Sequence, residues 1–100
     1  MANTFKVLFR GAATTNSATL YTTPANTTTL VSSIVVANAS ASSQTYSIFI
    51  DGTPLAELVS LASRDSVVIE PKQVLNAASV ITGLASSSNT KFHISGLEIA

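Results

Sequence analysis

The stretch Ile34–Asp51, IVVANASASSQTYSIFID, joins two apolar runs through a loop of small, uncharged residues. The first run is β-branched at most positions, and the second alternates so that Tyr46, Ile48 and Ile50 fall on one face. A period of two is typical of β-strands, and a short polar loop between two such runs is typical of a hairpin. The stretch therefore predicts a hairpin that packs one face into a β domain, with a flexible loop at 39–43.

The same alternation recurs along the whole chain, and no helical period competes with it. Turn residues separate the apolar runs at intervals of about ten residues. The predicted strands are Thr4–Arg10, Thr19–Thr22, Thr27–Ala37, Gln44–Asp51, Leu55–Leu61, Ser66–Glu70, Ser79–Ala85 and Lys91–Ile99, and Val74–Leu75 is either a short strand or a bend. The sequence thus predicts an all-β protein with a single domain, residues 1–100. We expect an antiparallel β-sandwich of eight or nine short strands, and the jelly roll is one form of such a sandwich.

The two terminal strands have apolar patterns that decide which face is buried. In the first strand, Phe5, Val7 and Phe9 alternate with other residues, which predicts one apolar face. In the last strand the apolar residues change from even to odd positions after Ile94, at Ser95-Gly96. A β-bulge at this dipeptide would keep all of them on the buried face.

Composition indicates a protein that associates with other proteins. The chain has 100 residues, of which 46% are hydrophobic but only 6% are aromatic. Charged residues make up 10% of the chain, whereas about 25% is usual for soluble domains. Because surface charge keeps proteins apart in solution, a surface with so little of it favours association. We therefore expect a subunit of a larger assembly.

Charge and local composition also exclude several classes of partner. The net charge is zero and neither sign forms a run, which argues against nucleic-acid binding, since that needs a basic surface. There is no cysteine, so disulfides and thiolate metal sites are excluded. No segment has the apolar length of a signal peptide or a transmembrane helix. We expect synthesis in the cytosol and no membrane partner.

Candidate catalytic and metal-binding residues are few. His93 is the only histidine, with no second histidine or cysteine to share a metal, so we interpret it as a strand residue. Asp51, Asp65 and Glu57 could supply oxygen ligands, but their spacing matches no calcium loop. Glu57 and Glu70 could be imagined as a glycosidase pair, yet so small a chain offers little mass for a cleft. The sequence predicts no catalytic residue, no metal site and no cofactor.

Several segments, taken together, carry a resemblance to a known family. They are the opening Met1-Ala2-Asn3-Thr4-Phe5-Lys6, the segment Tyr21-Thr22-Thr23-Pro24-Ala25 with Thr27-Thr28-Thr29, the strand end Val36-Ala37-Asn38 with its serine-rich loop, and the ending Ser95-Gly96-Leu97-Glu98-Ile99. In this order and spacing, the chain resembles short virion structural proteins of tailed bacteriophages, including phages of cyanobacteria. The resemblance implies a building block of the phage particle and does not say whether it belongs to head or tail.

The function that we predict is that of a capsid decoration, or cement, protein on the outside of the phage head. It would form a homo-oligomer, with a trimer favoured by the local three-fold positions between capsomers. Its partners would be further copies of itself and the major capsid protein, and its location the particle surface after synthesis in the host bacterial cytoplasm. The residues predicted to contact partners are Phe5, Lys6, Arg10, Tyr21, Tyr46, Leu97 and Ile99.

Two alternatives remain open at the level of sequence. A tail, neck or baseplate component could have the same fold and would bind tail proteins instead. A carbohydrate-binding module would need exposed aromatic rings to stack on sugars, and Tyr21 and Tyr46 are the tyrosines available for this. The loop 39–43 is interpreted either as a contact with a neighbouring subunit or as a plain solvent-exposed loop.

Overall fold

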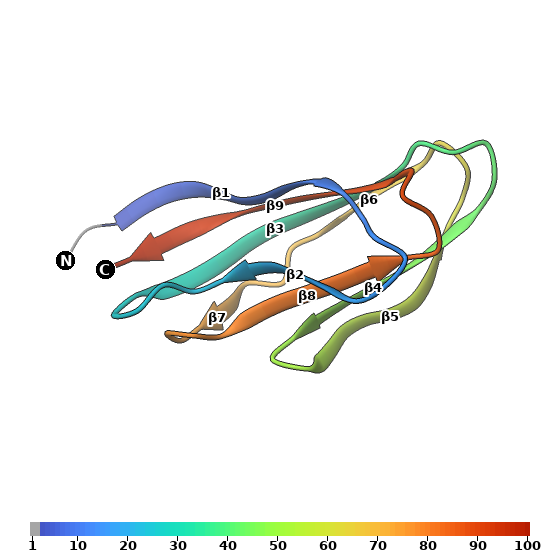
Figure 1. The fold of residues 1–100 in the computed structure, drawn as a ribbon. Helices are drawn as coiled ribbons and strands as arrows, with labels where there is room; N and C mark the ends of the chain where they lie inside the picture. The colour runs from blue at the N-terminus through green and yellow to red at the C-terminus, as the bar shows by residue number, and fades with distance from the viewer. Residues whose placement is uncertain (1–2) are drawn as a thin grey trace.

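The structure is a computed structural model that describes residues 3–100, and these residues form nine β-strands and no helix (Figure 1). The strands are β1 (Asn3–Ala12), β2 (Ala18–Thr22), β3 (Thr28–Asn38), β4 (Gln44–Ile50), β5 (Thr53–Leu61), β6 (Ser66–Ile69), β7 (Gln73–Leu75), β8 (Val80–Ala85) and β9 (Thr90–Ile99). Each predicted strand is present, within a few residues of its expected bounds. Within the described part of the chain, no helix is long and apolar enough to cross a membrane.

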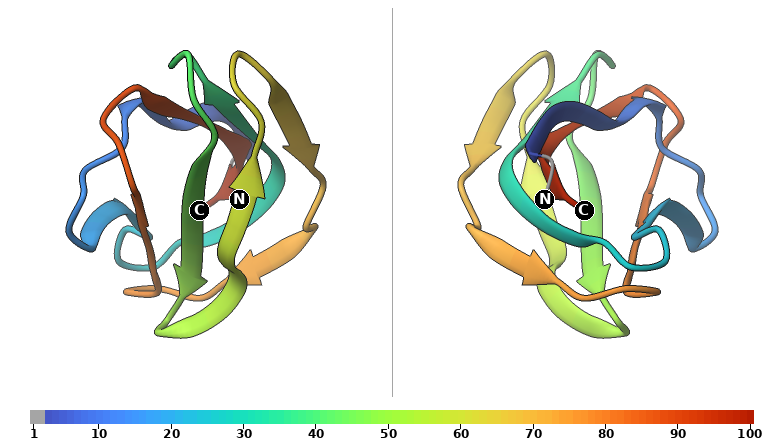
Figure 2. Two further views of the ribbon diagram at one scale, coloured as in Figure 1. Left: turned by 90° about the vertical axis from the view of Figure 1, so that its right-hand side faces the viewer. Right: turned by 90° about the vertical axis from the view of Figure 1, so that its left-hand side faces the viewer.

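The strands form two antiparallel sheets that pack face to face. Sheet A has the order β1-β9-β3-β6, with β7 also paired to β3, and sheet B has the order β2-β8-β4-β5. Figure 2 looks along the long axis of the molecule, whose extents are 45 × 22 × 18 Å, and shows the two sheets facing each other. The prediction of an antiparallel β-sandwich is confirmed.

The pairing of the strands is nested, as in a jelly roll. The first strand pairs with the last, β2 pairs with β8, β3 pairs with β6 and β7, and β4 pairs with β5. Strands β6 and β7 pair with successive parts of β3 and act as one edge strand, which is interrupted at Pro71 because proline has no N–H for the ladder. The sandwich therefore has the eight strand positions of a jelly roll, with one position split in two.

Aliphatic and aromatic side chains from both sheets fill the space between them. Fully buried residues of sheet A are Val31, Ile34, Val36, Phe92 and Ile94, and those of sheet B are Ile48 and Ile81. Burial of one such side chain stabilises the fold by roughly 1.5–3 kcal/mol. These residues come from four strands spread over the chain, so the core forms only when both sheets are assembled.

The stretch 34–51 is not a hairpin, and the prediction of one is wrong. Its first arm is the end of β3 in sheet A and its second arm is β4 in sheet B, and the two arms do not pair with each other. The face predicted for Tyr46, Ile48 and Ile50 is correct, because each pairs with an inward position of β8. Local alternation shows that each arm is a strand but does not show its partner.

The loop at 39–43 is organised around one buried side chain. Asn38 is 2% exposed, and its amide nitrogen donates to the carbonyl oxygens of Ser42, Leu61 and Ala62 at 2.9, 3.1 and 3.1 Å. Its amide oxygen accepts hydrogen bonds from the backbone N–H and the hydroxyl of Ser40 at 2.9 and 2.8 Å. The prediction of a flexible loop missed this network, which fixes the crossing between the two sheets.

The predicted bulge in the last strand is also wrong. Strand β9 keeps a continuous register, and the extra residues lie opposite Ser95 in its two neighbours, Leu8 in β1 and Ser32 in β3. Gly96 takes the next inward position of β9, and only glycine fits there because an added Cβ would stand 2.3 Å from the carbonyl oxygen of Leu30. Because β9 keeps its alternation through Gly96, the odd-numbered residues that follow it lie on the outer face.

The first strand has two apolar faces where one was predicted. The register shift between Val7 and Phe9 turns Phe9 inward against the core, while Phe5 and Val7 pair with outward positions of β9. Leu8, the extra residue, is 8% exposed. The bulge therefore divides β1 into an outer half with exposed apolar residues and a half that belongs to the core.

Candidate interaction surface

A row of apolar side chains crosses the outer face of sheet A near the chain termini. Phe5, Leu97, Leu30 and Val74 are direct cross-strand neighbours in β1, β9, β3 and β7. Neighbours in such pairs have Cβ atoms roughly 4.5–5.5 Å apart, so the four side chains are close enough to form one surface. Phe5 is 89% exposed and Val74 is 62% exposed. We call these four residues the apolar row.

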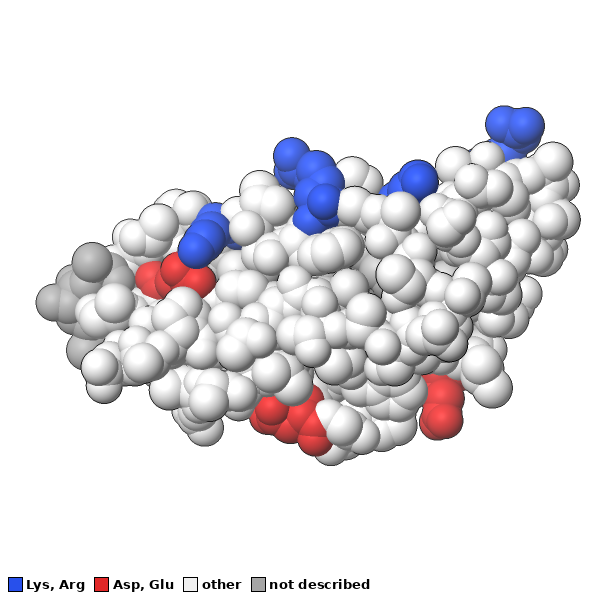
Figure 3. Space-filling model, viewed as in Figure 1, with Lys and Arg blue, Asp and Glu red and all other residues white. Residues whose placement is uncertain are grey.

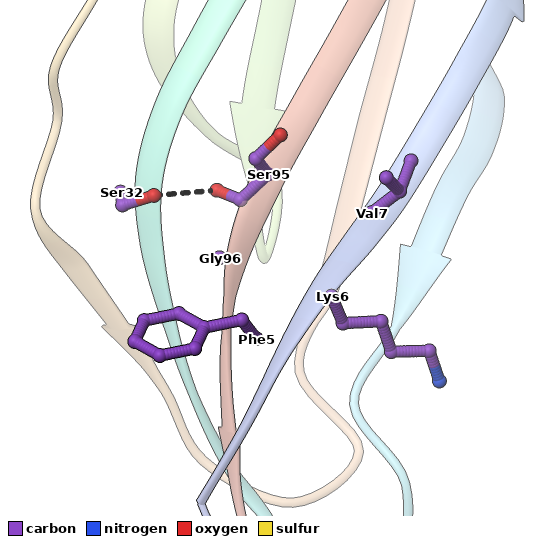
Figure 4. Close-up of a pocket in the computed structure, with 6 residues that line it drawn as sticks. All are labelled: Phe5, Lys6, Val7, Ser32, Ser95 and Gly96. Atoms are coloured by element: carbon purple, nitrogen blue, oxygen red, sulfur yellow. Dashed lines mark hydrogen bonds between the residues drawn. The ribbon is translucent and has the colours of Figure 1, made fainter.

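Beside the apolar row lies a groove with a volume of about 330 Å³. Its lining residues are Phe5, Lys6, Val7, Ser32, Ser95 and Gly96. Figure 4 shows the ring of Phe5 lying across β9 toward β3 next to Gly96, while the Lys6 side chain points to the opposite side. The groove exists because small residues meet there, including Ser32, whose hydroxyl donates to the Ser95 carbonyl oxygen at 3.0 Å.

Beyond the groove, the outer face of sheet A is basic. Arg10 and His93 are cross-strand partners, and Lys91 lies two residues from His93 on the same face of β9. Among the described strand residues that face outward from this sheet there is no carboxylate. Figure 3 shows basic groups along one long side of the molecule and, apart from one acidic group beside a basic one at one end, acidic groups along the opposite side.

A polar cluster ties the two sheets together under the apolar row. Tyr21 of β2 donates its hydroxyl to Glu98 of β9 at 2.5 Å and is 2.8 Å from the hydroxyl of Thr29 in β3. The ammonium group of Lys6 pairs with Glu98 at 3.3 Å. Burial, together with the hydrogen bond to the Glu98 carboxylate, raises the pKa of Tyr21 above its usual value. The cluster holds β1, β2, β3 and β9 in a fixed arrangement at this end of the sandwich.

The residues predicted to contact partners divide into three groups. Phe5, Leu97 and Ile99 come together on the outer face of sheet A, and Arg10 stands on the same face beyond the groove. Lys6 lines the groove while its ammonium group pairs with Glu98.

Tyr21 and Tyr46, at 9% and 3% exposed, belong to the core. Burial raises the pKa of Tyr46 as well. The two tyrosines that a sugar platform would use thus point into the sandwich.

Sequence reasoning missed Leu58, an exposed residue on the other sheet. Leu58 has a positive φ of 49° and is 70% exposed. With Glu57 it stands opposite Ser47, because the β4–β5 register shifts between Tyr46 and Ile48, and its N–H donates to the Ser47 hydroxyl at 2.9 Å. No local signal predicts a left-handed backbone at a leucine, since asparagine and glycine are the residues that usually adopt it.

The acidic residues considered as metal ligands hold turns together instead. The carboxylate of Asp51 accepts a hydrogen bond from the Val80 N–H, and that of Asp65 accepts one from the Ser66 N–H, at 2.9 and 2.8 Å. Within residues 3–100, no group of three or more His, Cys, Asp or Glu side chains is placed to share a metal ion.

The chain was also compared with known proteins. No model of a protein family matches the sequence, and no curated protein matches it either.

Proposed function

We propose that the chain is a structural protein of a tailed-bacteriophage particle, and that it acts as a decoration protein on the outer surface of the head. The observation that carries this proposal is the apolar row with its groove on a solvent-facing sheet. An exposed surface of this kind is typical of a protein–protein contact. The sequence resemblance to short virion structural proteins suggests that the assembly is a phage particle.

The architecture is compatible with this proposal without deciding it. Jelly rolls occur in viral capsid proteins but also in lectins and other classes, so the fold alone does not assign a function. What the sandwich supplies is a rigid frame. The cluster around Glu98 and the core behind β9 hold the apolar row in place, so that binding costs little ordering of the surface.

The mechanism is mechanical bridging of capsid subunits, with no catalytic step. A homo-oligomer that contacts two or three neighbouring capsid subunits binds through several sites at once. Linked contacts of this kind can exceed the affinity of one contact by ~10²–10⁴-fold. Because the contact is chiefly apolar, moderate salt weakens it little.

The test is the thermal stability of phage particles assembled with and without the protein. We expect particles that lack it to release their DNA at a lower temperature, and added protein to restore the wild-type temperature at both low and moderate salt. Particles that are equally heat-resistant but fail to join tails or to adsorb to host cells would show that the protein belongs to the tail.

A further inference from the structure

Leu58 is held at the surface by the backbone of β5. A positive φ is unfavourable for a bulky residue, and such a conformation often marks a functional position. The bulge that causes it is fixed by the hydrogen bond from the Leu58 N–H to Ser47, a residue that is 2% exposed. The chain thus keeps a rigid apolar projection on the outer face of sheet B, where a residue better suited to that backbone would relieve the strain.

The groove on sheet A is suited to receive such a projection. It is a shallow hollow that is open to solvent, so an apolar side chain of another molecule can lie against its lining residues. The rim is formed by Phe5 and Val7, which are 89% and 47% exposed, and the floor by Ser95 and Gly96. An apolar side chain that enters the groove would cover the exposed rim.

The distribution of charge indicates what enters the groove. Arg10, Lys91 and His93 lie on the outer face of sheet A, whereas Glu57 stands beside Leu58 on sheet B. Two copies that met through their sheets A would bring like charges together, which is unfavourable. Sheet A of one copy against sheet B of another brings opposite charges together, as the two sides of Figure 3 illustrate.

We propose that the groove receives Leu58 of a second copy of this chain, so that sheet A of one copy packs on sheet B of the next. This proposal rests on the proposed function, in which the chain forms a homo-oligomer, and it assigns the groove to the contact between copies rather than to the contact with the capsid. A head-to-tail contact of this kind uses two different surfaces, and it closes into a ring when the rotation between copies allows it or continues as an open stack when it does not. The broad face of a molecule 45 Å long and 22 Å wide is large enough for the ~800 Å² per partner that stable interfaces bury.

The test uses variants that disable one surface at a time. Leu58→Asn removes the apolar projection but suits the left-handed backbone, and Leu58→Met is its matched control because it keeps an apolar side chain. Ser95→Trp fills the groove from an outward-facing position, and Val7→Trp takes its place if the first variant does not fold. The measurements are light scattering for mass, and the melting temperature at a dilution where all variants are monomeric.

We expect the wild type and Leu58→Met to form oligomers, and Leu58→Asn and Ser95→Trp each to be monomeric. The melting temperature of monomeric Leu58→Asn should equal or exceed that of the monomeric wild type. A mixture of Leu58→Asn and Ser95→Trp should form dimers with one copy of each, because one variant keeps the groove and the other keeps the projection.

A monomeric wild type, a Leu58→Asn variant with the wild-type mass, or a mixture that stays monomeric would each overturn the proposal. Binding of the wild type to phage particles is measured separately. A protein that binds particles but fails these tests contradicts only the proposed contact, whereas a protein that does not bind particles contradicts the proposed function.

Discussion

Replacing Asn38 by alanine should destabilise the protein more than any other single change in the loop that joins the two sheets. The substitution removes the donor to the carbonyl oxygens of Leu61 and Ala62 and the acceptor for the N–H of Ser40. Leu61 and Ser40 are 6% and 9% exposed, so water reaches their polar groups poorly.

The magnitude follows from the groups that are left without partners. A buried donor or acceptor that loses its partner costs about 1–3 kcal/mol. The two buried groups are the carbonyl oxygen of Leu61 and the N–H of Ser40. Because water at the loop surface recovers part of the loss, we expect the free energy of unfolding to fall by about 2–4 kcal/mol. For a domain of this size, 1 kcal/mol lowers the melting temperature by roughly 4–8 °C. We therefore expect Asn38→Ala to melt roughly 8–32 °C below the wild type.

The assay is urea and thermal unfolding followed by circular dichroism, with Asn89→Ala as the matched control. Asn89 lies in an exposed loop, and its side chain makes no hydrogen bond to the described residues, so its loss should change stability by less than ~0.5 kcal/mol. A second variant, Asn38→Asp, places a carboxylate against three carbonyl oxygens and should be less stable at neutral pH than at acidic pH. If Asn38→Ala and Asn89→Ala unfold at the same urea concentration, the network does not fix the crossing.

Three further predictions concern the sheets. Gly96→Ala should cost about 1–3 kcal/mol or more, because the added Cβ meets a backbone oxygen, whereas Gly11→Ala, whose Cβ would have ordinary contacts, should change stability little in urea titrations. Tyr21 and Tyr46 have raised pKa values, so the folded state keeps its phenolic protons where the unfolded chain loses them. The resulting stability is complete below pH ~10 and is lost as the pH rises further, and replacing both tyrosines by phenylalanine should flatten this alkaline decline of the melting temperature. Deleting 91–100 removes the strand between β1 and β3 and should give insoluble protein, and a soluble, cooperatively folding truncation would show that β9 is dispensable.

The strands were predictable from sequence because their signals are local. Alternation marks β4 and β8, and turn residues such as Asp51-Gly52 and Pro71 mark where strands end. The partners of the strands were not predictable in the same way. The arms of the stretch 34–51 carry apolar faces that would suit a hairpin as well as two separate sheets.

The candidate surface was predictable only in part, for a related reason. Phe5 and Leu97 were among the predicted contact residues, but their common face depends on bulges in β1 and β3. Those bulges lie opposite Ser95 of β9, so they depend on pairing between strands that are far apart in the sequence. The exposure of Leu58 likewise depends on a positive φ that its residue type disfavours.

The proposed place on the phage head is tested most directly by the copy number of the protein in purified particles of the tailed phage that, under this proposal, encodes it. Quantitative mass spectrometry against the major capsid protein gives this number. We predict hundreds of copies per particle, because a decoration protein repeats one contact over the whole capsid surface. A handful of copies would assign the protein to the tail, neck or baseplate, and the lack of any copy in the particle would contradict a virion function altogether.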